Sequence, residues 1–168
     1  MASRPMIAVL SGVSGSGKTT VGRLLAQALS WPYIEGDDLH PAANIEKMSK
    51  GVPLTDYDRQ SWLVELSRVF AEYLHGEKSA VASCSALKRS YRDRLRAAGP
   101  GVVFVQLSTT PEIIRLRLTT RQAHFAGVGL MASQFAALEP LDSDEGMIIE
   151  ASTDPADIVL TIRQRWAL

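Results

Sequence analysis

The stretch MIAVLSGVSGSGKTT at residues 6–20 joins a short apolar run to a glycine-rich loop. Residues 6–10 are continuously apolar and too few for a helix, so they predict a buried strand. Residues 12–19 match G-x-x-x-x-G-K-[ST] between this strand and a helical pattern, which is the context that the motif requires. The glycines let successive backbone N–H groups point inward around phosphate oxygens, and the helix adds its positive end. The stretch therefore predicts a phosphate-binding loop (P-loop).

Each polar position of this loop has an expected role. Lys18 should reach the β- and γ-phosphates of a nucleoside triphosphate, and the hydroxyl of Thr19 should ligate Mg²⁺. The expected nucleotide contacts of the loop are Gly12, Ser14, Gly15, Ser16, Gly17, Lys18, Thr19 and Thr20.

A magnesium site usually needs an acid near the loop. The third apolar run ends in residues 82–85 without one, and the nearest acids that follow a strand are Glu35 and Asp37. We expect one of these two carboxylates to help hold Mg²⁺ through water.

Further short apolar runs alternate with helical periodicity. The expected strands are 5–10, one starting at 33–34, 79–84, 102–107 and 147–150. Helices are expected around 21–29, from Thr55 through Tyr73, 87–95, 111–121 and 155–166, with a weak one at 44–48. Such alternation indicates a parallel sheet covered on both faces, so we predict a three-layer α/β fold in one domain, 1–168. Residues 122–140 look irregular and predict a mobile lid.

Composition excludes several classes of protein. The 18 basic and 18 acidic residues cancel, which leaves no overall field to attract nucleic acid or an anionic membrane. Cys84 is the only cysteine, so an intramolecular disulfide is impossible and a reducing compartment is indicated. No apolar run approaches the ~20 residues of a membrane span. We expect a cytoplasmic protein that acts on a small molecule.

The P-loop could belong to a switch or to a catalyst. A GTPase needs N-K-x-D to read guanine, and the one asparagine, Asn44, is followed by isoleucine. A small kinase fits both the length and the lid-like segment, because water must be excluded while an acceptor hydroxyl competes for the γ-phosphate.

The acceptor site is expected where the second strand ends, beside the P-loop. Asp37 could orient a hydroxyl and accept its proton, which makes it a candidate catalytic residue. His40 could donate a hydrogen bond to a polyol. Arg59 could capture a carboxylate in bidentate fashion, and Lys88 and Arg92 share one face of a helix near the same crevice. The acceptor could therefore be a small hydroxy acid.

Two cations precede the expected lid. Arg117 and Arg121 lie one helical turn apart. Arg121 could swing onto the phosphates and neutralise charge that develops during transfer, so we predict a catalytic role for it. Arg117 could bind ATP phosphates or stay in solvent, and His124 begins the lid.

These motifs occur together in one known family. G-V-S-G-S-G-K-T, G-D-D-L-H-P, N-I-E-K-M, G-x-P-L-T-D-x-D-R-x-x-W-L, C-S-A-L-K-x-x-Y-R-D-x-L-R, R-x-x-H-F and S-Q-F-x-x-L-E follow one another over residues 6–140. The set resembles the gluconokinase family. The resemblance implies ATP- and Mg²⁺-dependent phosphorylation of the 6-hydroxyl of D-gluconate, a sheet in the order 2-3-1-4-5 as in shikimate and adenylate kinases, and a homodimer.

The resemblance also implies how the acceptor site is divided. Asp37 would meet the hydroxyl end of gluconate, while basic residues hold the acid end. The expected substrate contacts are Asp37, His40, Lys47, Arg59, Lys88, Arg92 and His124, and adenine contacts are expected near residues 152–155. A shikimate-type or other small-metabolite kinase on the same scaffold is the alternative.

Overall fold

The computed structural model describes residues 4–120 and 128–168. Its strands are β1 (Ile7–Ser11), β2 (Tyr33–Glu35), β3 (Ala80–Ser83), β4 (Val102–Ser108) and β5 (Gly146–Glu150). They form one parallel sheet in the order β2-β3-β1-β4-β5. The α/β class, the parallel pairing and the strand order are confirmed.

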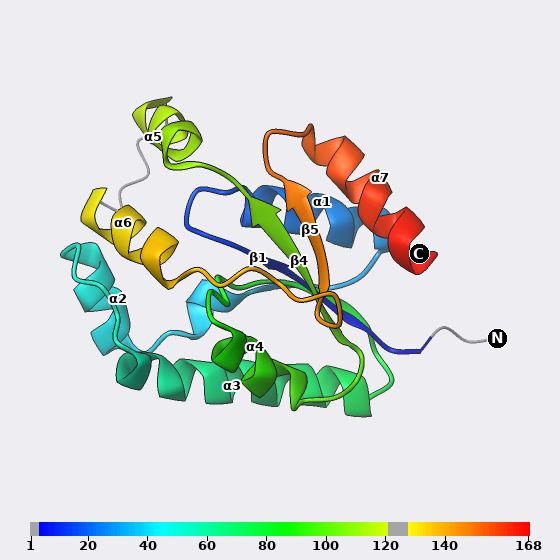
Figure 1. Ribbon diagram of the computed structural model, residues 1–168. Coiled ribbons are helices and arrows are strands. Elements are labelled where there is room, and N and C mark those ends of the chain that lie inside the picture. Colours follow the sequence, from blue (N-terminus) through cyan, green and yellow to red (C-terminus); the bar gives the residue numbers. More distant parts are fainter. Residues whose placement is uncertain (1–3, 121–127) are drawn as a thin grey trace.

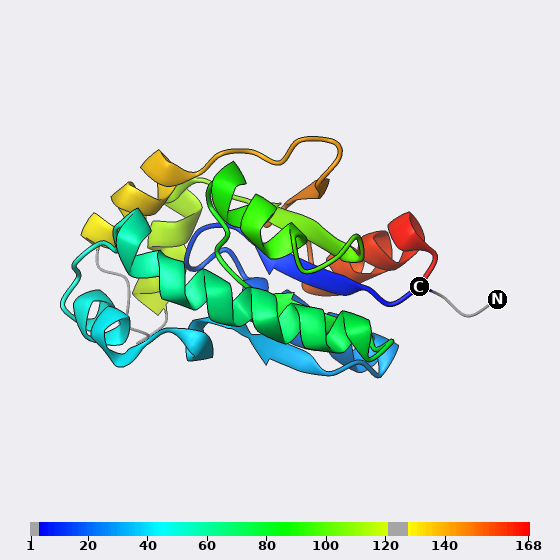
Figure 2. The ribbon, with the colours of Figure 1, turned by 90° about the horizontal axis from the view of Figure 1, so that it is seen from below.

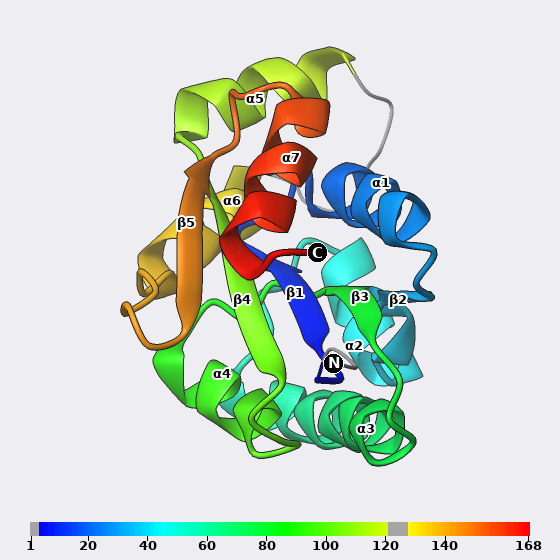
Figure 3. The ribbon, with the colours of Figure 1, turned by 90° about the vertical axis from the view of Figure 1, so that its right-hand side faces the viewer.

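The helices cover both faces of this sheet, as predicted. They are α1 (Lys18–Leu29), the 3₁₀ turn η1 (Gly36–Leu39), α2 (Ala42–Ser49), α3 (Asp56–His75), α4 (Arg89–Arg96), α5 (Pro111–Thr120), α6 (Val128–Ala137) and α7 (Pro155–Trp166). Helices α3 and α4 lie on one face and α1 and α7 on the other (Figure 1). The view from below shows α3 and α4 in front of the sheet (Figure 2), and the end-on view shows the three layers (Figure 3).

Strand β1 shows why both faces need a cover. Side chains of a strand point alternately to opposite faces. Ile7 and Val9 belong to the core under α3 and α4, with Trp62, Leu66 and Phe70. Ala8 and Leu10 belong to the other core, which contains Val21 and Leu25 of α1 and Ile158 and Ile162 of α7. Because every residue of β1 is buried, its first four residues, Ile7–Leu10, read as a continuous apolar run that ends at the buried Ser11.

Two helices begin at residues whose side chains cap them. Thr55 caps α3 in a capping box, in which its side chain accepts from the Asp58 N–H and the Asp58 carboxylate accepts from the Thr55 N–H. Asp154 caps α7 by accepting from the Ala156 N–H.

The segment expected to be irregular contains a helix. Helix α6 occupies residues 128–137, within the predicted lid at 122–140. Met131 is buried with Val13 of the P-loop, Leu87 and Ile114 in a third apolar cluster. These partners come from three distant parts of the chain, so the sequence pattern of α6 does not reveal its buried face.

Helices α2, α5 and α6 gather at one end of the molecule, around the loop that follows β1 (Figure 1). This is the carboxyl end of the parallel strands, where such sheets bind ligands. In the described part of the chain, no helix is long and apolar enough to cross a membrane.

Candidate active site

The P-loop follows β1 in a conformation that its glycines permit. Gly12 has φ 129°, and a Cβ there would lie 2.8 Å from the Leu107 carbonyl oxygen of β4. Gly17, the N-cap of α1, has φ 102°. Both positions exclude larger residues. The loop thereby places the start of α1 at the strand ends.

The loop fits a polyphosphate. Lys18 Nζ donates to the Val13 carbonyl oxygen at 2.9 Å, so the ammonium lies over the loop. Burial lowers the pKa of Lys18, and the nearby charges of Asp37 and Glu35 oppose that shift. The Ser16 hydroxyl is buried and has no hydrogen-bond partner among the described residues. A buried unsatisfied donor beside a cation and inward N–H groups suits an anion such as a nucleotide phosphate.

The Mg²⁺ expectation is tested by the surroundings of Thr19. Its hydroxyl donates to Glu35 Oε2 at 2.9 Å, and the same oxygen accepts from the Tyr33 hydroxyl at 2.8 Å. Tyr33 also bonds the Ser83 hydroxyl at 2.7 Å, and its burial raises its pKa to about 12, so it stays a donor. Of the two predicted acids, Glu35 is the one beside Thr19.

A hydroxyl and one carboxylate fit a magnesium ion that takes its other ligands from water and substrate phosphates. Within residues 4–120 and 128–168, no group of three or more acids, histidines or cysteines could hold a metal by itself.

A cleft of about 510 Å³ opens on one side of the P-loop. Its lining residues are Gly15–Gly17 of the P-loop, Thr20 and Val21 of α1, Arg117 of α5, residues 151–155 and Ile158. Arg117 Nη1 donates to the carbonyl oxygens of Gly15 and Ser16, both at 3.1 Å, and Nη2 donates to Ala151 at 2.7 Å. Arg117 therefore lies against the P-loop, and residues 152–155, where adenine contacts were expected, line the same cleft.

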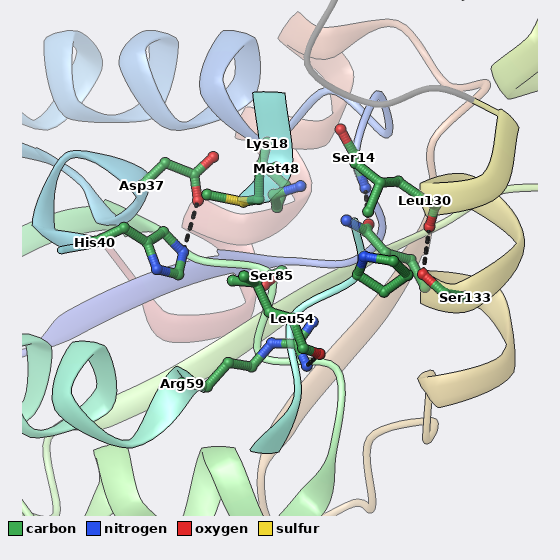
Figure 4. Close-up of a pocket in the computed structure, with 12 residues that line it drawn as sticks. Ser14, Lys18, Asp37, His40, Met48, Leu54, Arg59, Ser85, Leu130 and Ser133 are labelled. Atoms are coloured by element: carbon green, nitrogen blue, oxygen red, sulfur yellow. Dashed lines mark hydrogen bonds and ion pairs between the residues drawn. The ribbon is translucent and has the colours of Figure 1, made fainter. Parts of the chain in front are cut away.

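A second cavity, of about 90 Å³, lies on the other side of the P-loop (Figure 4). Its lining residues are Ser14, Lys18, Asp37, His40, Met48, Pro53, Leu54, Arg59, Ser85, Leu130, Ser133 and Gln134. In Figure 4, Asp37 and His40 lie on one side, Arg59 and Leu54 below, and Ser14, Leu130 and Ser133 on the far side. The predicted Asp37, His40 and Arg59 are thus brought together with Lys18.

Asp37 is held by a turn that Trp62 supports. A Cβ at Gly36 would lie 2.3 Å from the Ser83 carbonyl oxygen, so only glycine lets η1 approach β3 this closely. The Gly36 carbonyl accepts from Trp62 Nε1 at 2.7 Å. The carboxylate of Asp37 remains exposed to the cavity, with 66% of its side chain accessible.

His40 is a neutral hydrogen-bond donor in this site. Burial, and then the charge of Arg59, lower the pKa of His40 to about 4. Its ring stacks on Trp62 with centroids 4.1 Å apart. Asn44 Nδ2 donates to the Asp58 carbonyl at 2.8 Å and lies 3.2 Å from His40 Nδ1, which assigns Nδ1 as an acceptor. The proton therefore sits on Nε2, 4.0 Å from Asp37 Oδ1.

Arg59 is oriented before any substrate binds. Its Nη1 donates to the Leu54 carbonyl at 2.7 Å and to the Tyr91 hydroxyl at 3.3 Å, and its guanidinium lies 5.5 Å from the Tyr91 ring centroid. Tyr91 in turn donates to Asp56, which also accepts from Lys88 Nζ at 2.9 Å. Lys88 therefore pairs with Asp56 beside the Tyr91 ring and is not among the residues that line the cavity.

Two other predicted cations are also engaged elsewhere. Lys47 pairs with Asp58 at 2.8 Å and ties α2 to the start of α3. Arg92 is fully buried against Glu145, with Nε 2.7 Å from Oε1, and also donates to four backbone carbonyls. The predicted substrate role of Arg92 is corrected to a structural one, because its donors face the protein interior. Arg121 and His124 lie outside the described residues.

Several lining residues were not predicted. Met48, Leu54, Ser85 and Gln134 carry no ionisable group. Trp62, which contacts Gly36 and His40 without lining the cavity, reads as a core residue of α3. The family motifs contain the four lining residues but gave no reason to assign a role to any of them.

Comparisons with known proteins find kinases that are similar in sequence and in fold. The family model described as shikimate kinase matches residues 14–158. Gluconokinase from Gluconobacter oxydans is 44% identical over 160 residues, which cover 95% of this chain and 90% of the relative. The crystal structure of a gluconokinase from Sinorhizobium meliloti superposes with a TM-score of 0.88 at 40% identity, covering 99% of this chain and 94% of the other. Shikimate kinase from Bacteroides thetaiotaomicron, at 21% identity and a TM-score of 0.69 over 97% of this chain and 99% of the other, shares the fold.

Proposed function

This chain belongs to the shikimate kinase family and, within it, to the gluconokinases, and on that premise we propose that it transfers the γ-phosphate of ATP to the 6-hydroxyl of D-gluconate. The products are 6-phospho-D-gluconate and ADP. The observation that carries the proposal is the cavity beside the P-loop that Lys18, Asp37 and Arg59 line together. A sugar acid has a hydroxyl at one end and a carboxylate at the other, so it needs an acid at the first and a cation at the second.

Asp37 is the proposed catalytic base. It orients the 6-hydroxyl and accepts its proton while the oxygen forms a bond to the γ-phosphorus. The bond from that phosphorus to the β–γ bridging oxygen breaks, and its electron pair leaves on ADP. Lys18 contacts the β- and γ-phosphates and balances the charge that accumulates there. The Thr19 hydroxyl, and Glu35 through water, would hold a Mg²⁺ ion, whose charge would offset that of the triphosphate.

Arg59 and His40 are the proposed acceptor-binding residues. Tyr91 and the Leu54 carbonyl hold the Arg59 guanidinium in place, so little side-chain entropy is lost when it binds the gluconate carboxylate. The neutral Nε2–H of His40 can donate to a hydroxyl without repelling or attracting charge. Because its pKa lies near 4, this donor persists across the physiological range.

The cleft beside Arg117 is the proposed site of the nucleoside. Arg117 bonds the carbonyls of Gly15 and Ser16 and so supports the loop that holds the phosphates. Residues 152–155 are the proposed adenine contacts. The catalytic role of Arg121 and the lid around it stay predictions.

A panel of sugar acids tests the proposal. Purified protein with ATP and Mg²⁺ is offered gluconate, shikimate and related acids, and ADP release is measured in a coupled assay. We expect turnover that depends on gluconate, with a product whose phosphorus NMR signal is coupled to the protons on C6. Turnover with shikimate in place of gluconate would support the alternative kinase. ADP release that no acceptor stimulates would overturn the kinase proposal as a whole.

We also propose that the protein works in the cytoplasm as a homodimer. The cytoplasmic location rests on Cys84, a buried free thiol directly after β3. The homodimer rests on the family to which the chain belongs. Light scattering across a concentration series tests the dimer, and a constant monomeric mass would contradict it.

A further inference from the structure

The P-loop is shared between the two cavities. Gly15–Gly17 line the nucleotide cleft, whereas Ser14 lines the acceptor cavity. Phosphate oxygens bound by the loop must therefore end near Ser14, where donor and acceptor meet. The Ser14 N–H donates to Gln134 Oε1 at 2.6 Å. Gln134 thus stands at the boundary across which the phosphoryl group passes.

Helix α6 holds Gln134 at this boundary. Met131, one turn earlier, is 4% exposed and packs with Val13, the neighbour of Ser14. The Ser133 hydroxyl donates to the Leu130 carbonyl at 2.9 Å, so it is satisfied within the helix. In Figure 4, Leu130 and Ser133 form the wall of the cavity beside Ser14. The helix and the P-loop are therefore joined by an apolar contact and a hydrogen bond.

An amide bound in this way has a defined polarity. The Ser14 N–H donates to Oε1 of Gln134, a residue that lines the acceptor cavity, so Nε2 is the end of the amide that carries the two N–H donors. We propose that Gln134 Nε2 binds an oxygen at the hydroxyl end of the acceptor, an inference that rests on the function proposed above. A neutral donor suits that end, because it stabilises a hydroxyl without pairing with the carboxylate that belongs to Arg59.

A competing interpretation is that Gln134 Oε1 merely replaces a phosphate oxygen and is displaced when ATP binds. Gln134 lines the acceptor cavity and is absent from the lining of the nucleotide cleft, which favours the acceptor role. The two interpretations predict different effects on ATP binding. Removing a competitor would tighten ATP binding, whereas removing an acceptor contact would leave ATP binding unchanged.

The experiment compares Gln134→Leu, Gln134→Glu and the control Ala136→Ser, an exposed position on the same helix. We expect Gln134→Leu to raise the KM for gluconate about three- to ten-fold, the effect of losing one neutral hydrogen bond. The dissociation constant for ATP, measured by calorimetry, should stay within two-fold. Gln134→Glu keeps an acceptor for the Ser14 N–H but adds negative charge near the γ-phosphate. Its kcat should therefore fall below that of Gln134→Leu. Ala136→Ser should match the wild type.

Two results overturn the proposal. One is a gluconate KM for Gln134→Leu within two-fold of wild type, and the other is a tightening of ATP binding. Should Gln134→Leu fail to fold, Gln134→Met carries the same test with a side chain of similar length. Failure of the proposed function is recognised separately, because the wild-type protein would then show no gluconate-dependent turnover. In that case the variants are titrated in the calorimeter with the acid that the panel selects, and their affinities for that acid decide the role of Gln134.

Discussion

Replacing Arg92 with methionine should destabilise the protein without weakening substrate binding. Arg92 and Glu145 both have side chains that are 0% exposed, and the guanidinium binds the carboxylate at 2.7 and 3.2 Å. The same guanidinium satisfies the carbonyls of Ala86, Leu87, Glu139 and Pro140. Methionine fills much of the volume but supplies no donor, so a buried carboxylate loses its main partner.

Removing one partner of a buried ion pair costs about 3–5 kcal/mol. The Asp142 N–H, 2.9 Å from Glu145 Oε2, and Arg89, 3.5 Å from the same oxygen, remain and favour the lower half of that range. For a chain of this size each kcal/mol lowers Tm by roughly 2–4 °C, so a cost of about 3–4 kcal/mol should lower the Tm of Arg92→Met by about 6–16 °C.

Circular dichroism melts measure this change, with Arg94→Met, an exposed position on the same helix, as the control. The double variant Arg92→Met with Glu145→Leu should recover a large part of the loss, because no unpaired charge stays buried. Assayed well below its Tm, Arg92→Met should keep its gluconate KM within two-fold. An unchanged Tm together with a ten-fold higher KM would refute the structural role and restore the substrate role that the helical spacing suggested.

Three further predictions concern the site. Lys18→Ala should lower kcat at least a hundred-fold with an unchanged circular dichroism spectrum, since the ammonium acts on charge that develops in transfer; wild-type turnover would contradict the P-loop assignment. Arg59→Ala should weaken gluconate binding at least ten-fold and ATP binding less than two-fold in calorimetry, because its partner is the acceptor carboxylate; equal losses would argue against that pairing. The pKa of His40 is about 4 in the fold and 6.5 in the unfolded chain, so the unfolded state gains the proton first as pH falls. The free energy of unfolding therefore decreases between pH 6.5 and 4, by up to about 3 kcal/mol. The Tm of His40→Gln should therefore decline less than wild type across this pH window, and parallel curves would exclude His40 as the cause.

Local patterns predicted much of the fold. A strand buried on both faces is apolar throughout, a P-loop needs glycines at fixed spacing, and caps such as Thr55 act within three residues. The sequence also predicted that Asp37 and Arg59 would lie near each other in the proposed acceptor site. Parallel strands end at one edge of the sheet; Asp37 lies in the turn η1 directly after β2, and the first turn of α3 brings Arg59 to the same cavity.

Distant packing decided the rest. Spacing places Lys88 and Arg92 one turn apart but does not say what lies opposite each. The chain returning from α6 brings Glu145 onto Arg92, while Asp56 takes Lys88. Helix α6 is stable where it is because Val13, Leu87 and Ile114 bury Met131. Hydrogen bonds and burial depend on residues brought together from far along the chain, so the side chains that face the substrate emerge only once the layers are assembled.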